Sequence, residues 1–204
     1  MKLAKYSVIP MLAVLGGCVT GFTEVLPGVN TLGSLRVTAD ANWNKAPSTA
    51  TPSARSTSRT WTQDGLLLDR ITIIPGVKDG EAIFSSRNKS AALPVFRADM
   101  LPNEIEELVE SSIVKLYGEG QSAVSTSGLR PQGFGSDGGF MFDIEAAVTE
   151  SPDYKGLVGA FIVDETLYLI MFLAADPHYF DKHLASADAI IKSATLSTKT
   201  ITNF

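Results

Sequence analysis

Residues 139–175 constrain the fold more than any other part of the chain, because they predict three consecutive strands. In the first of them, residues 140–148, apolar side chains alternate with polar ones such as Asp143. A period of two residues is typical of an antiparallel strand with one buried and one hydrated face. Phe142 is therefore predicted to point into a core, and Met141 to point away from it.

The two segments that follow are apolar on both faces. They comprise residues 157–163 and 167–174, and residues 164–166 between them have the length of a hairpin loop. A strand without a polar face needs cover on both sides of its sheet. We therefore expect a layer on each side of the sheet, with helices as the cover.

Two amphipathic segments supply such helices. The first begins near Pro102, where Asn103 and Glu106 have the spacing of a capping box, and Gly118 is its natural end. The second follows Pro177 and carries apolar side chains along one face.

The N-terminal half predicts further strands. Residues 35–44 have the most regular alternation in the chain and predict one continuous strand. Asp64-Gly65 lies between apolar segments, which is a hairpin signal because a type I′ turn needs positive φ. A two-residue loop at this point places Trp61 opposite Leu68.

The remaining segments complete the predicted architecture. Residues 46–58 are rich in Ser, Thr, Pro and Ala and predict a loop, whereas residues 82–85 and 123–129 predict strands. The order of strands, helix, strands and helix predicts an α+β domain, with a mostly antiparallel β-sheet flanked by helices.

Composition excludes several functional classes. The chain of 204 residues has a net charge of −5, and no cluster of Lys and Arg offsets it, so no nucleic-acid partner is expected. Two His and one Cys cannot form a Cys/His zinc site, and a single Cys cannot form a disulfide within the chain.

The N-terminus has the features of a targeting segment. Lys2 and Lys5 precede a short apolar run, residues 8–15, which is too short to span a membrane. The run closes with Leu15-Gly16-Gly17-Cys18, which resembles the lipobox of bacterial lipoproteins. The resemblance implies acylation of Cys18 and cleavage just before it. The alternative is an ordinary secretory signal beside an incidental cysteine.

Four segments are predicted along the chain: a lipoprotein signal peptide (1–17), a lipidated tether (18–33), a single α+β domain (34–197) and a loose tail (198–204). Val19 stands where lipoproteins kept at the inner membrane tend to carry Asp. The lipoprotein resemblance therefore implies a location in the bacterial cell envelope, on the outer membrane and facing the periplasm.

The second half of the chain carries a further resemblance. A predicted helix and strand, the glycine-rich segment 134–140, two paired strands and a closing helix that ends at Ser193 follow one another as in PsbP-like domains. The likeness covers residues 35–196 in the order of elements and residues 125–193 in residue pattern. It implies an α/β/α sandwich and a role in binding other proteins, and it supplies no catalytic residues.

Three patterns suggest chemistry, and each has a plainer interpretation. Residues 133–138 match G-x-G-x-x-G, but a strand follows where a nucleotide site needs a helix, so a turn and no nucleotide are predicted. His178 and His183 lie about 140° apart around a helix and are predicted to be surface residues that share no metal. Asp143 and Glu145 share a polar strand face, where carboxylates are usually solvated rather than catalytic.

Trp43, Trp61 and Tyr154 are the candidate recognition residues, because aromatic side chains are enriched at binding hot spots; burial in the core is the alternative. No cofactor, metal site or enzymatic activity is predicted, since the sequence has no nucleophile elbow and its sole cysteine is assigned to lipid.

We expect a non-enzymatic lipoprotein, held at a membrane through Cys18, that binds or scaffolds another envelope protein. The alternative is a small-ligand binder with a pocket between the sheet and the N-terminal hairpin. A hydrolase is the least favoured function.

Overall fold

The computed structural model describes residues 21–51, 53–86, 92–118 and 120–197. Their elements, in chain order, are β1 (Thr23–Val25), β2 (Gly28–Leu32), β3 (Leu35–Ala39), β4 (Trp43–Lys45), a 3₁₀ turn η1 (Ser48–Ala50), β5 (Arg59–Thr62), β6 (Asp69–Lys78), α1 (Pro102–Tyr117), β7 (Ser122–Phe134), β8 (Asp137–Val148), β9 (Tyr154–Val163), β10 (Thr166–Ala175), α2 (His178–Lys192) and β11 (Thr195–Leu196).

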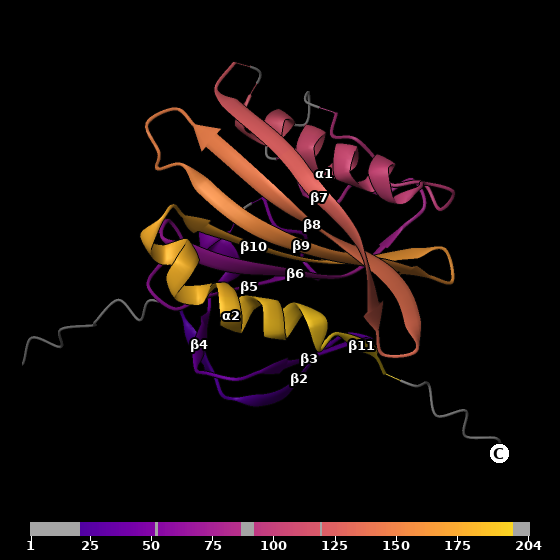
Figure 1. The fold of residues 1–204 in the computed structure, drawn as a ribbon, viewed down its shortest axis with the longest axis horizontal. Helices are drawn as coiled ribbons and strands as arrows, with labels where there is room; N and C mark the ends of the chain where they lie inside the picture. Colours follow the sequence, from indigo (N-terminus) through magenta and orange to yellow (C-terminus); the bar gives the residue numbers. More distant parts are fainter. Residues whose placement is uncertain (1–20, 52, 87–91, 119, 198–204) are drawn as a thin grey trace, which may run out of the picture.

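Eight of the strands form one large sheet in the order β1-β4-β5-β6-β10-β9-β8-β7, and each neighbouring pair in it is antiparallel (Figure 1). A smaller sheet of order β11-β3-β2 lies at the bottom of the same view, and its strand β3 contacts α2. The α+β prediction with a mostly antiparallel sheet is confirmed.

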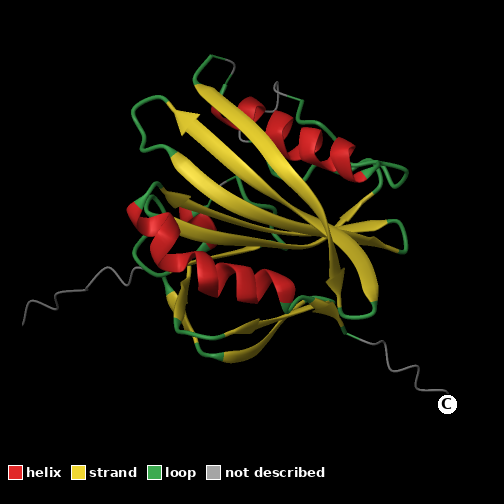
Figure 2. Cartoon of the chain, viewed as in Figure 1, coloured by secondary structure: helices red, strands yellow, loops and turns green. Residues whose placement is uncertain are grey.

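The two helices cover opposite faces of the large sheet (Figure 2). Ile105 and Val109 of α1 belong to one buried core together with Phe142 of β8. Ile190 of α2 belongs to a second buried core together with Met141, the neighbour of Phe142 on the same strand. The layers are therefore helix, sheet and helix, as expected for two strands that are apolar on both faces.

The prediction that Met141 points away from a core is wrong. Its exposed fraction is 1%, against 0% for Phe142. Successive side chains of β8 do point to opposite faces of the sheet. At this position, however, one face packs in the core that contains α1 and the other in the core that contains α2, so neither meets water. Farther along the strand Glu145 is exposed, so only that end has one hydrated face.

The hairpin between β9 and β10 is confirmed. Its loop is the pair Asp164 and Glu165, which have φ of 48° and 58°. Positive φ at both central residues is the geometry of a type I′ turn, which matches the twist of the flanking strands. Leu169 and Ile170 of β10 are buried on opposite faces of the sheet, as the sequence predicts.

The predicted tether, residues 18–33, is wrong over its described part. Strand β1 pairs with β4 and strand β2 pairs with β3. Strands of three and five residues are too short to give a recognisable period, and of these residues only Val25 is buried. The folded domain therefore begins before residue 34.

The predicted strand at residues 35–44 is two strands in two sheets. β3 belongs to the small sheet and β4 to the large one, and the chain bends at residues 40–42 between them. Alternation continues across the bend because Val37 and Trp43 are both buried, each on its own strand.

The Asp64-Gly65 hairpin exists with a different register. Trp61 pairs with Ile71 instead of Leu68, so the loop comprises residues 63–68. Arg59 faces Ile73, whereas a two-residue loop would have set it opposite Arg70, so the repulsion between these two arginines does not arise.

Three smaller predictions at element ends also differ from the structure. Residues 82–85 are not a strand, and β7 extends beyond the predicted 123–129, with an irregularity between Ser127 and Arg130. At the start of α1, the Glu104 carboxylate accepts the Leu101 N–H at 2.7 Å, in place of the predicted capping pair.

The described helices include none that is both long and apolar enough to cross a membrane. Cys18, the predicted signal peptide (1–17) and the predicted tail (198–204) lie outside the described residues.

Candidate functional site

A pocket of about 280 Å³ opens on the α1 face of the large sheet, beside the β5–β6 hairpin. Its floor consists of three adjacent strands. Thr60 of β5, Arg70 and Thr72 of β6, and Met171 and Leu173 of β10 provide the side chains of this floor.

The pocket exists because α1 does not cover this part of the sheet. The helix packs along β7 and β8, and the loop that follows β4 lies over β5 and β6 instead. That loop contributes only small side chains, which cannot fill the volume that helix side chains fill elsewhere. The remaining walls are Ala50, Thr51, Ser53 and Ala54 of the loop, Leu66 and Leu67 of the hairpin, Phe84, and Ile113, Leu116 and Tyr117 of α1.

The mouth of the pocket is apolar. Leu67 is 72% exposed and Tyr117 is 46% exposed, and both line the pocket. Large apolar side chains that remain in water at the edge of a cavity are typical of a binding site rather than of a packing fault.

The loop wall is held in place by specific contacts. Arg55 forms an ion pair with Glu81 at 2.6 Å and donates to the carbonyl oxygen of Ala82. The pKa of Glu81 is lowered, first because the Lys78 N–H donates to its carboxylate and then because Arg55 does. The Ser85 N–H also donates to the Ser53 carbonyl. The pocket therefore has a fixed wall although that wall contains little regular structure.

Arg70 is the only charged side chain among the described residues that line the pocket. It is half-buried; its Nη1 donates to the Leu66 carbonyl at 3.1 Å, and its guanidinium lies 5.1 Å from the centre of the Tyr154 ring. Within the described part of the chain no carboxylate pairs with it. A half-buried cation without a counter-ion makes this end of the pocket electropositive.

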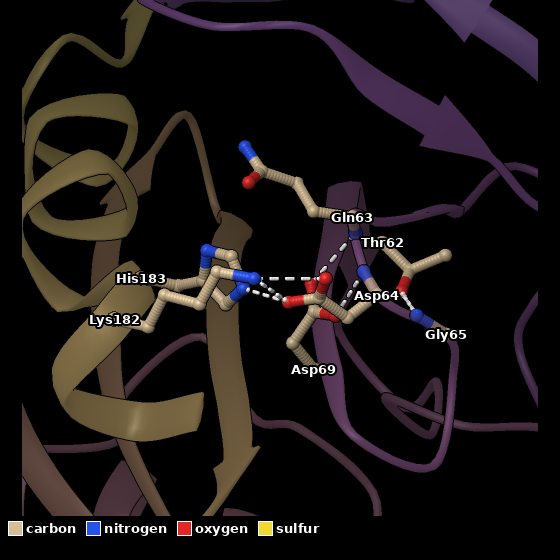
Figure 3. A network of polar contacts seen from close by, with 7 residues as sticks. All are labelled: Thr62, Gln63, Asp64, Gly65, Asp69, Lys182 and His183. Atoms are coloured by element: carbon tan, nitrogen blue, oxygen red, sulfur yellow. Dashed lines mark hydrogen bonds and ion pairs between the residues drawn. The ribbon is translucent and has the colours of Figure 1, made fainter. Parts of the chain in front are cut away.

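The β5–β6 loop that borders the pocket is built around the buried carboxylate of Asp69, which is 0% exposed (Figure 3). Its oxygens accept hydrogen bonds from Thr62 Oγ1 at 3.1 Å, the Gln63 N–H at 2.8 Å and the Asp64 N–H at 2.7 Å. The Gly65 N–H donates in turn to Thr62 Oγ1 at 2.9 Å. Because three hydrogen bonds to the carboxylate replace those it would make with water, its burial costs little free energy, and the three donors fix the path of the loop.

Asp64 ties the same loop to α2. Its carboxylate lies 2.6 Å from Lys182 Nζ and 2.6 Å from His183 Nε2 (Figure 3). Hydrogen bonding from Lys182, and then from His183, lowers the pKa of Asp64 below its ordinary value of 3.8. The His183 side chain is 3% exposed and lies against the Trp43 ring.

Asp64, Asp69 and His183 each offer one ligand atom, and these atoms lie within 4.8 Å of one another. Such a cluster has the donor types of a metal site. The oxygens of both carboxylates already accept hydrogen bonds from the protein, and Lys182 Nζ lies against both oxygens of Asp64, which is where a cation would bind. The arrangement therefore acts as a structural clasp that joins the loop to α2.

The clasp and the pocket share the loop of residues 63–68. Leu66 and Leu67 line the pocket, and Tyr154 Oη donates to the Leu67 carbonyl at 2.9 Å. The Ala175 N–H donates to the carbonyl of Leu68 at 2.9 Å. The polar contacts on the α2 side thus set the position of one wall of the pocket on the α1 side.

The three predicted recognition residues are all buried. Trp43 is 0%, Trp61 2% and Tyr154 5% exposed. None presents a ring at the surface, so the structure supports the alternative that they are core residues. Tyr154 still contributes indirectly, because it supports both Arg70 and the Leu67 carbonyl.

The other candidate residues also have structural roles. His178 is exposed, as predicted, but the prediction of a surface position is wrong for His183. Asp143 forms a two-point ion pair with Arg130 on the neighbouring strand, at 3.0 and 3.1 Å. The predicted turn in the glycine-rich residues 133–138 is present as the two-residue connection Gly135-Ser136 between the paired ends of β7 and β8.

The sequence interpretation missed Arg70 as a pocket residue and Asp69 as the centre of a loop. Asp69 carried a signal, because it is a single carboxylate between Leu66-Leu67-Leu68 and an apolar strand. Such a residue is buried only with partners. The small side chains of residues 46–58 were a signal for incomplete packing, but they were interpreted only as a loop.

No family model matches the chain, and no curated protein matches it either. Among solved structures, it is similar to cyanobacterial PsbP (CyanoP) from Synechocystis sp. PCC 6803, with a TM-score of 0.54 at 10% identity over 91% of this chain and 99% of that one. It also matches the Saccharomyces cerevisiae Ran-binding protein Mog1p, with a TM-score of 0.47 at 8% identity over 87% and 96% of the two chains. LpqN of Mycobacterium tuberculosis, involved in cell envelope biogenesis, gives a TM-score of 0.35 at 10% identity over 89% and 87%. The likeness to CyanoP shows a PsbP-like fold, which was predicted, and at this identity shows the fold alone.

Proposed function

We propose that the chain is a non-enzymatic binding domain of the bacterial cell envelope, and that it holds a small apolar or amphipathic ligand in the pocket between β5, β6, β10, α1 and the loop residues Ala50, Thr51, Ser53 and Ala54. The acyl group predicted on Cys18 would anchor it to the outer membrane, facing the periplasm. The observation that carries the proposal is the pocket itself, with its apolar mouth and its small-residue wall.

The size of the pocket limits the ligand. Binding sites for small molecules usually measure about 300–1,000 Å³, and this pocket, at about 280 Å³, lies just below that range. If a water-sized group occupies about 30 Å³, the space holds roughly nine such groups. A single ring system or one short alkyl chain fits this volume, whereas a two-chain lipid does not.

The lining argues against catalysis. Its described residues include no carboxylate, histidine, lysine or cysteine side chain. General acid–base catalysis and the activation of a hydroxyl nucleophile mostly use such a group within hydrogen-bond distance, and the phenol of Tyr117 is on a side chain 46% exposed at the mouth. Thr60 and Thr72 are therefore available for binding but not for nucleophilic attack.

A protein partner in the envelope remains a prediction to which no residue is now assigned. The aromatic residues expected to recognise it lie in the two cores. A partner would have to use other surfaces, and the pocket gives a more specific basis for function.

The test is binding of the apolar fluorophore N-phenyl-1-naphthylamine to the full-length Cys18→Ala chain, which cannot be acylated. Its naphthyl ring system matches the enclosed volume, and its phenyl ring would remain at the mouth beside Leu67. We expect enhanced, saturable fluorescence that Ala54→Phe abolishes, because the added ring fills the pocket from its loop wall. Ala41→Phe is the matched control, since Ala41 lies outside the pocket, at the bend between β3 and β4. Equal fluorescence in wild type and Ala54→Phe, with both folded by circular dichroism, would overturn the proposal.

A further inference from the structure

Within the floor of the pocket, the polar side chains are gathered on one side. Strands β5, β6 and β10 are neighbours in that order. Thr60, Arg70 and Thr72 lie on the first two, and Met171 and Leu173 lie on the third. The floor therefore changes from polar to apolar across three strands, which suits a ligand with a polar head and an apolar tail.

The polar side offers donors. Thr60 and Thr72 are buried, and their hydroxyl oxygens lie 3.4 Å apart, so either can donate to the other. In such a pair one hydroxyl proton is used and the other has no acceptor among the described residues. Arg70 adds a guanidinium with several N–H groups, of which one Nη1 hydrogen bond to the Leu66 carbonyl is formed.

The acidic groups nearest in sequence do not neutralise Arg70. The Asp69 carboxylate is held by Thr62, Gln63 and Asp64 within the loop. The Asp64 carboxylate is held by Lys182 and His183 on the opposite side of the sheet from the pocket. A half-buried arginine is costly without a partner, and an anion in the pocket would supply one.

We infer, on the basis of the proposed function, that the ligand is a single-chain anionic amphiphile. Its carboxylate or phosphate accepts hydrogen bonds from Arg70 and from the Thr60–Thr72 pair. Its tail lies against Met171 and Leu173 and below the C-terminal end of α1, where Ile113 closes the apolar side. The volume of about 280 Å³ holds roughly nine water-sized groups, head group included, so the end of a ten-carbon tail would extend past Leu67 at the mouth.

The experiment compares four ten-carbon probes in displacing the fluorophore from the Cys18→Ala chain, each below its micelle concentration: decanoate, decyl phosphate, decanol and decyltrimethylammonium. We expect both anions to bind at least about tenfold more tightly than decanol, since hydrogen bonds to charged groups are the strong ones. The cation should bind most weakly. Tighter binding of decanoate than of decyl phosphate would identify a fatty-acid-like ligand, and the reverse order a lipid-phosphate head.

Arg70→Gln should reduce the affinity for decanoate to that for decanol and leave decanol unchanged. Arg36→Gln, on the exposed face of β3 in the other sheet, is the matched control and should change neither. Equal affinity of wild type for decanoate and decanol, or equal weakening of both by Arg70→Gln, would overturn the inference.

Two further measurements test the ligand class even if the Arg70→Gln variant does not fold. If Arg70→Gln does not fold, Arg70→Lys should retain a preference for the anions, and 0.5 M NaCl should weaken wild-type binding of decanoate but not of decanol. Loss of both effects would also overturn the inference. Failure of the fluorophore itself to bind would instead refute the proposed function, whereas fluorophore binding without anion preference would refute only the ligand class.

Discussion

Asp69→Ala is expected to be among the most destabilising substitutions outside the apolar cores. The carboxylate is fully buried and accepts hydrogen bonds from the Thr62 hydroxyl and from two backbone N–H groups, those of Gln63 and Asp64. Hydrogen bonds to a charged group contribute about 1.5–3 kcal/mol each, and a buried donor left without a partner costs about 1–3 kcal/mol. Since Gln63 and Asp64 are partly exposed, water can replace the acceptor for their N–H groups. We expect a net loss of about 3–5 kcal/mol in the free energy of unfolding.

Urea unfolding followed by circular dichroism measures this loss, and Asp188→Ala is the matched control. The Asp188 side chain on α2 is 33% exposed and pairs with the exposed Lys192 at 2.7 Å. Such a pair contributes about 1 kcal/mol or less. Asp69→Ala should also weaken fluorophore binding, because the loop positions Leu66 and Leu67 at the pocket. A loss of about 1 kcal/mol or less for Asp69→Ala, equal to that for Asp188→Ala, would refute the central role of this carboxylate in the loop.

Three further predictions test other parts of the molecule. Cys18→Ala should leave the precursor uncleaved and unacylated; a mature mass and membrane partition identical to wild type would contradict the lipoprotein hypothesis. Phe142→Ala and Met141→Ala should each destabilise the fold, by about 3–5 and about 2–4 kcal/mol, because each side chain is buried in its own core; a nearly neutral Met141→Ala would contradict the second core. Lowering the pH should remove the stability contributed by Asp64: its pKa is depressed in the folded state, so the contribution is present above the ordinary 3.8 and is lost as pH falls through the lower folded value. Between pH 5 and 2, Asp64→Asn should therefore lose less stability than wild type in chemical unfolding, and parallel losses would rule out this linkage.

The strands of the second half could be predicted because their patterns report their surroundings directly. Strands β9 and β10 lack a polar face, and this alone indicates cover on both sides. Their two-residue turn lies where the apolar runs are interrupted by Asp164 and Glu165. Met141 was misassigned because a period of two distinguishes the faces of a strand but does not say whether the second face meets water or a helix.

The N-terminal half was harder to predict because its strand ends and its loop length depend on contacts between residues that are distant in sequence. Alternation through residues 35–44 cannot reveal that the chain changes sheets at residues 40–42. Asp64-Gly65 signalled a hairpin correctly, but the loop is longer because Asp69 is drawn into it. The contact between His183 and Asp64 joins residues 119 apart, which no local pattern reports.

The pocket exists because the small side chains of the loop after β4 do not fill the volume next to β5 and β6. Sequence patterns show which side chains favour burial, but a volume that no side chain fills leaves only an indirect signal. Here that signal is the run of small residues over β5 and β6, combined with a helix that packs elsewhere on the same face.

Methyl NMR of the Cys18→Ala chain during titration with decanoate tests most directly whether the pocket binds a ligand. Methyl signals of Ile113, Met171 and Leu173 should shift together and saturate, because these side chains line the pocket. Those of Ile170 and Ile190, in the core on the α2 side, should stay in place. Shifts confined to the α2 core, or no shifts at saturating decanoate in a folded sample, would contradict a ligand pocket on the α1 face.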